Sequence, residues 1–82
     1  MATNPIHSAI ARDMAPVTPH DTNANKYFGI KVKGNAGNVV VVTDKGATRT
    51  IPFTSGEFEP IAVTKVLATG TTATGIWGYI LY

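Results

Sequence analysis

The chain has 82 residues, of which 44% are hydrophobic, with no cysteine and a formal net charge of +2. One domain of this size buries only about 60–65% of the surface that its unfolded chain exposes, so its margin of stability is small. Disulfides and thiolate metal sites are excluded, and we expect contacts between subunits to supply further burial. The charge is too small to indicate nucleic-acid binding by itself.

Residues 1–25 are expected to form an N-terminal arm outside the compact domain. Asn4 followed by Pro5 is typical of a helix start, which predicts a short helix over residues 5–14 and then a loop. This helix would place three apolar side chains on one face, namely Ile6, Ile10 and Met14. It is too short to be stable alone in water, so the arm is either flexible or ordered against a neighbouring subunit. No secretory signal or membrane-spanning run is expected.

Residues 26–82 are expected to form an all-β domain, because valine, isoleucine, threonine and aromatic residues recur in short runs between turns. The predicted strands are residues 27–33, 38–43, 47–53, 61–67 and 76–82. Asp44-Lys45-Gly46 is typical of a tight hairpin with glycine in the left-handed conformation. The sequence therefore predicts a small antiparallel sandwich or barrel of about five to six strands.

In the last two predicted strands, the alternation of residues predicts which side chains share a face. In 61–67, alternation places Val63 on the face opposite Val66. In 76–82 both faces are apolar, so we expect one to be covered by the core and the other by a second sheet or another subunit. The candidate subunit interface consists of four aromatic residues, Phe58, Trp77, Tyr79 and Tyr82.

No pattern of catalytic or metal-binding residues is present, so the sequence predicts a protein that is not an enzyme and has no cofactor. Glu57 and Glu59 flank Phe58 in a predicted loop, and His20 with Asp21 lacks a third metal ligand. The run of small residues at 69–75 lacks the lysine of a phosphate-binding loop. Lysines on the predicted strands are interpreted as solvated, with a small barrel that binds single-stranded nucleic acid as a less favoured alternative.

Three segments together carry a resemblance to a known family: Thr18-Pro19-His20-Asp21-Thr22, the valine run 39–42, and VLATGTTATGI at 66–76. Over residues 18–82 the chain resembles the small spike base proteins of tailed phages and gene transfer agents. The resemblance implies a structural virion protein on the capsid surface, acting as a spike base, vertex or decoration protein, that is made in the host cytoplasm.

The same resemblance implies particular partners. They are further copies of the chain, in a pentamer or trimer, the major capsid protein, and a spike or fibre protein; no membrane is involved. The N-terminal arm then becomes the candidate capsid contact, through Pro5, Ile6, Ile10 and Met14. The alternative within the same class is a component of a tail fibre or baseplate.

Overall fold

The structure is a computed structural model that describes residues 12–22, 24 and 26–80. Within this part of the chain there are seven strands and no helix. The strands are β1 (Asp13–Pro16), β2 (Ile30–Val32), β3 (Gly37–Thr43), β4 (Thr48–Phe53), β5 (Phe58–Glu59), β6 (Val63–Leu67) and β7 (Ile76–Ile80).

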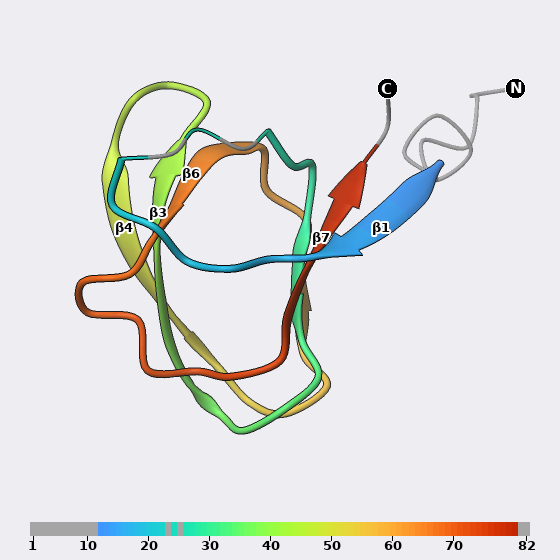
Figure 1. The fold of residues 1–82 in the computed structure, drawn as a ribbon. Coiled ribbons are helices and arrows are strands. Elements are labelled where there is room, and N and C mark those ends of the chain that lie inside the picture. Colours follow the sequence, from blue (N-terminus) through green and yellow to red (C-terminus); the bar gives the residue numbers. More distant parts are fainter. Residues whose placement is uncertain (1–11, 23, 25, 81–82) are drawn as a thin grey trace, which may run out of the picture.

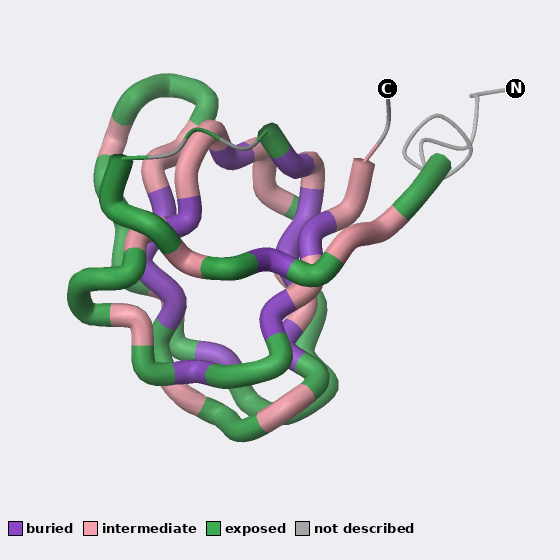
Figure 2. Tube along the Cα trace, viewed as in Figure 1, coloured by how far each residue is buried: buried purple, intermediate pink, exposed green. Residues whose placement is uncertain are grey.

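The strands form two antiparallel sheets that face each other (Figure 1). One sheet has four strands in the order β1-β7-β2-β5, and the other has three in the order β4-β3-β6. Figure 2 shows the buried parts of the chain along the inner sides of both sheets. The predicted all-β antiparallel sandwich is therefore confirmed.

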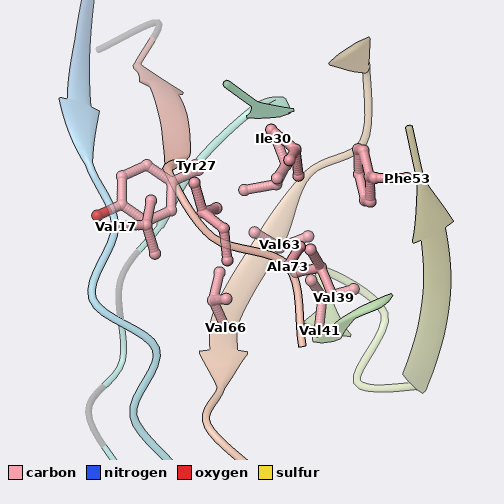
Figure 3. Close-up of a cluster of buried hydrophobic side chains, with 11 residues drawn as sticks. Val17, Tyr27, Ile30, Val39, Val41, Phe53, Val63, Val66 and Ala73 are labelled. Atoms are coloured by element: carbon pink, nitrogen blue, oxygen red, sulfur yellow. The ribbon is translucent and has the colours of Figure 1, made fainter. Parts of the chain in front are cut away.

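The core lies between the sheets and is built mainly from β-branched side chains (Figure 3). Five residues are less than 2% exposed: Ile30, Val32, Val39, Val41 and Val63. Burying each such side chain contributes roughly 1.5–3 kcal/mol. In β3, Val39 and Val41 point into this core, and the turn at Gly70 lies within contact distance of Val40 on the other side. Residues 39–41 are thus covered on both faces of the strand.

Tyr27 connects the two sheets where the chain enters β2. Its backbone exchanges two hydrogen bonds with Val63 of β6, at 3.0 and 2.9 Å, while the next residues bond to Tyr79 of β7. This change of partner explains why β2 is shorter than the predicted strand 27–33. The ring of Tyr27 lies against Gly78, where a side chain would leave it no room.

The N-terminal arm differs from its prediction in the part that the structure describes. Asp13–Pro16 is a strand, paired with β7 from Asp13 opposite Ile80 to Pro16 opposite Trp77. The last two residues of the expected helix, Asp13 and Met14, are therefore extended. Pairing with β7 gives this segment backbone partners that a short isolated helix could not match. Arg12, also part of the expected helix, donates its N–H to the Ile80 carbonyl of β7 at 2.7 Å, and residues 5–11 lie outside the described range.

A β-bulge in β6 corrects the predicted strand faces. Val42 lies opposite Lys65, but the next residue, Thr43, lies opposite Val63. The extra residue between them, Thr64, shifts the alternation by one. Val63 and Val66 consequently both point into the core, at 0% and 3% exposure, and the prediction that they lie on opposite faces is wrong.

Candidate interaction face

The described residues contain no cluster of three or more potential metal ligands and no buried polar or charged residue. None of the described segments is a helix with the length and hydrophobicity needed to cross a membrane. The features that remain as candidates are a surface rich in aromatic side chains and a loop held by threonines.

The aromatic surface is the outer side of the four-stranded sheet. Directly opposed residues of antiparallel strands point to the same face. Met14 lies opposite Tyr79, and Lys31 lies opposite both Trp77 and Phe58. We call these five residues the aromatic face. They come from all four strands of the sheet, so the face exists only once the sheet has formed.

The rings of the aromatic face contact one another directly. Phe58 and Tyr79 pack edge to face, with centroids 4.8 Å apart and planes at 64°. Phe58 is 43% exposed, while Trp77 and Tyr79 are half-buried. The Phe58 ring occupies the space that a side chain at Gly29 would need. The glycine just before β2 therefore leaves room for the Phe58 ring over the sheet.

Positive charges accompany the rings. The Lys33 Nζ lies 5.2 Å from the centre of the Trp77 ring, a cation–π contact that contributes about 0.5–1 kcal/mol at an exposed site. At the opposite corner, a hollow of about 250 Å³ is lined by Arg12, Asp13, Met14 and Tyr79. Lys31 lies between these two points, in register with Trp77 and Phe58. The surface is apolar at its centre, with Lys31 and Lys33 on one side and the oppositely charged Arg12 and Asp13 at the other corner.

The structure places three of the four candidate interface residues, Phe58, Trp77 and Tyr79, on this one face. Tyr82 lies outside the described residues, as do Pro5, Ile6 and Ile10 of the candidate capsid contact. Met14 is described, and β1 brings it next to Tyr79. Alternation in the predicted strand 27–33 places Lys31 and Lys33 on one face of that strand. Sequence reasoning missed that Trp77 and Phe58 share this face, because that depends on the pairing of β2 with β7 and β5.

The second candidate feature is a clip formed by Asp21. Its carboxylate accepts hydrogen bonds from the backbone N–H groups of Ala68, at 3.0 Å, and Thr69, at 2.9 Å, and from the Thr69 hydroxyl at 2.7 Å. These bonds favour the ionised form, and the N–H of Thr69 does most to lower the pKa of Asp21. The clip joins two of the three segments that carry the family resemblance, residues 18–22 and 66–76.

Threonines hold the rest of loop 68–75 against the neighbouring chain. The hydroxyl oxygens of Thr71, Thr72 and Thr74 accept the backbone N–H groups of Val40, Asn38 and Asn35, at 3.0, 2.8 and 2.8 Å. These side chains take the place of a strand partner. The backbone N–H groups of residues 71–74 already donate to the carbonyls of Ala68, Asn38 and Asn35, so they are not free to bind a phosphate. The structural interpretation of this motif therefore fits its geometry.

Comparison with known proteins finds a similar chain in a solved capsid structure. No protein-family model matches the chain, and no curated protein sequence matches it. A solved structure described as the capsid of a native GTA particle, computed with C5 symmetry, contains a chain of the same fold, with a TM-score of 0.76. The two chains are 30% identical, and the match covers 85% of this chain and 83% of the other.

The chain belongs to the family of this gene transfer agent (GTA) capsid protein. The similarity spans nearly the whole GTA capsid protein, so it concerns the complete sandwich and not one shared motif. The resemblance to phage and gene-transfer-agent proteins is thereby confirmed at the level of a capsid-related family.

Proposed function

We propose that this protein is a structural component of a phage-like particle and sits on the capsid surface as a spike base, vertex or decoration protein. The observation that supports this most is the similarity to a GTA capsid protein over 85% of the chain. The surface agrees with it, since Phe58, Trp77 and Tyr79 are large apolar side chains that a solitary domain has no reason to group on one face.

In this role the protein acts by contact and not by catalysis. A cysteine-free domain of 82 residues gains stability when further surface is buried, which favours a homo-oligomer, a pentamer or a trimer, on the particle. The aromatic face is the surface on which a neighbouring subunit docks. The arm with Pro5, Ile6 and Ile10 is the proposed contact with the major capsid protein.

The test uses particles assembled without this protein, to which the purified protein is added. We expect the protein to sediment with the particles and to appear on the capsid surface by electron microscopy. Density on the tail or baseplate would instead support the alternative of a tail-fibre component. A protein that stays in the supernatant at saturating concentration would contradict the proposed function.

The capsid role of the arm is tested separately by deleting residues 2–11. This deletion leaves β1 intact, whereas deleting residues 2–17 would also remove β1 and the buried Val17. We expect the shorter deletion to fold and to bind particles much more weakly. Unchanged binding would exclude the arm as the capsid contact while leaving the capsid-surface function in place.

A further inference from the structure

We propose that prolines close the sheet edges of this sandwich, so that copies of the free chain do not join strand to strand. An uncovered edge strand presents unpaired N–H and C=O groups with which a strand of another chain can pair. The two sheets have four edge strands, β1 and β5 in one sheet and β4 and β6 in the other. The inference goes beyond the proposed function and does not depend on it.

The β6 edge is covered by the chain itself. The N–H of His20 donates to the Val66 carbonyl at 2.9 Å, and the backbone of Tyr27 exchanges two hydrogen bonds with Val63 at 3.0 and 2.9 Å. The segment between β1 and β2 thus already uses the outer backbone groups at these positions of β6, which are then closed to another chain.

The β1 edge is left without a free N–H group. Val17, directly after β1, donates its N–H to the Ile76 carbonyl at 2.8 Å. Backbone groups alternate between the partner strand and the open side along an antiparallel pair, so those of Met14 and Pro16 face the open side. The Met14 N–H donates to the Asp13 carboxylate at 2.8 Å, and Pro16 has no N–H. A strand added here would find carbonyl acceptors and no donor.

The β4 edge is interrupted by a proline in its second half. The N–H of Thr43 donates to the Ala47 carbonyl across the β3–β4 turn at 2.8 Å, and this bond sets the alternation along β4. The backbone groups of Thr48, Thr50 and Pro52 therefore point away from β3. Thr48 and Thr50 each offer one N–H to the open side, but Pro52 offers none, so the row of donors stops after two.

A charged side chain adds to the protection of β4. Arg49 lies opposite Val41, which points into the core, so Arg49 is on the inner face of the sheet although it is exposed. An inward-facing charge on an edge strand is one of the ways in which sheet proteins resist strand addition. A second β4 placed antiparallel to the first, centred on Thr50, would bring two Arg49 side chains to diagonal positions on one face, where like charges repel.

The β5 edge is only two residues long, Phe58–Glu59, and Pro60 follows it. The N–H of Val32 donates to the Glu57 carbonyl at 3.2 Å, so the backbone groups of Phe58 point to the open side and the next outward position is Pro60. One donor therefore remains on this edge. Three of the chain's five prolines stand where an edge would otherwise present a donor: Pro16, Pro52 and Pro60.

The experiment restores the missing donor on β4 with Pro52→Ala. Amide hydrogen exchange of residues 48–52, measured at increasing protein concentration, reports strand pairing because an outward N–H is protected once a strand of another chain accepts it. We expect the unmodified protein to exchange rapidly at Thr48 and Thr50 at all concentrations. Pro52→Ala should gain protection there and self-associate about tenfold or more tightly. An oligomer formed through the aromatic face leaves these amides exposed, so the readout distinguishes the two contacts.

Three further variants control the interpretation. Pro19→Ala removes a proline from the segment after β1, away from the open edges, and should behave like the unmodified protein. Pro52→Ala combined with Thr50→Pro moves the proline two positions along the same edge, and should abolish the protection because the N–H of residue 50 also points outward. Asp13→Ala combined with Pro16→Ala opens the β1 edge and should give protection at residues 14 and 16. This variant tests the inference should Pro52→Ala fail to fold.

Two results would overturn the inference. One is a folded Pro52→Ala that gains no protection, or that associates no more than Pro19→Ala does. The other is concentration-dependent protection of Thr48 and Thr50 in the unmodified protein, since the edge would then be open as it stands. Neither result bears on binding to particles, so the proposed capsid function would remain.

Discussion

At the residue scale, one carboxylate links distant parts of the chain: Asp21 bonds to Ala68 and Thr69, which lie 47 and 48 positions later in the sequence. Its oxygens receive three donors from Ala68 and Thr69, so the charged form is favoured in the folded state. The position is exposed, and the bond network, not burial, fixes loop 68–75 to the segment before β2. The pKa of Asp21 is consequently lowered from its ordinary value of 3.8.

Replacing Asp21 with Asn should lower the thermal midpoint, because the clip loses its charge. A lowered folded-state pKa means that the contribution is complete above the unfolded pKa of 3.8 and disappears as pH falls through the folded value. The difference from the unmodified protein should therefore be constant near neutral pH and vanish in strong acid. Melting curves across pH measure it, with Asp44→Asn as control. A difference that grows on acidification would contradict the clip.

Gly78 and Gly29 offer a second test, since each makes room for an aromatic ring. A Cβ at Gly78 would collide with the ring of the buried Tyr27, whose backbone is bonded to Val63. A Cβ at Gly29 would lie 2.5 Å from the far edge of Phe58, which is 43% exposed and can move outward.

We expect Gly78→Ala to reduce the free energy of unfolding by about 1–3 kcal/mol, as overpacking of a core does. Gly29→Ala should cost much less and should separate Phe58 from Tyr79. Urea denaturation compares the two variants. Equal losses would show that Tyr27 is not held in place by its link to Val63.

At the element scale, threonine side chains of loop 68–75 supply the hydrogen bonds that a neighbouring strand would otherwise supply. The loop runs from β6 of one sheet to β7 of the other, and its hydroxyl oxygens accept backbone N–H groups that would otherwise lack a partner. Thr71 has the most buried of these bonds, and its own hydroxyl donates to the Leu67 carbonyl.

Thr71→Val keeps the shape of the side chain and removes both bonds. We expect it to reduce the free energy of unfolding by about 1–3 kcal/mol, because the Val40 N–H is left unpaired in a partly buried place. The Val40 amide should also exchange with solvent faster. Thr48→Val, on an exposed position of β4, is the matched control and should be nearly neutral. Similar losses for both valines would rule out this role of the loop.

The same scale shows what sequence patterns can predict. Strands β3, β4, β6 and β7 follow from runs of β-branched and aromatic residues, and Gly46, at φ 86°, has the predicted left-handed conformation. Strand β1 was missed because Asp-Met-Ala-Pro has neither alternation nor strand propensity, and becomes a strand only by pairing with β7. The bulge at Thr64 was missed because local alternation does not specify register.

Only part of the aromatic face could be predicted, because local alternation gives the face of a strand but not its pairing. Alternation alone places Trp77 and Tyr79 on one side of their strand. Phe58 lies beside these two residues only because β5 pairs with β2. Lys33 lies over the Trp77 ring only because β2 pairs with β7. These long-range pairings are set by the whole sheet, so no local pattern contains them.

For the whole molecule, the central question is where the folded unit begins. The sequence places the start of the β domain at residue 26, but β1 completes the four-stranded sheet and Val17, just after it, is 7% exposed in the core. The backbone of Val17 also donates to the Ile76 carbonyl at 2.8 Å. The folded unit therefore includes residues that the sequence assigns to the arm.

Two truncations test this boundary. Deleting residues 2–11 should leave the free energy of unfolding nearly unchanged, because β1 and Val17 remain. Deleting residues 2–17 should reduce it by at least about 1.5–3 kcal/mol through the loss of Val17 burial alone. It would also expose the edge of β7, which invites pairing between chains, so light scattering should rise at concentrations where the shorter deletion stays clear. Urea denaturation and amide exchange of β7 measure the difference. If the two truncated proteins are equally stable and equally soluble, β1 is an appendage of the sandwich and the folded unit begins after it.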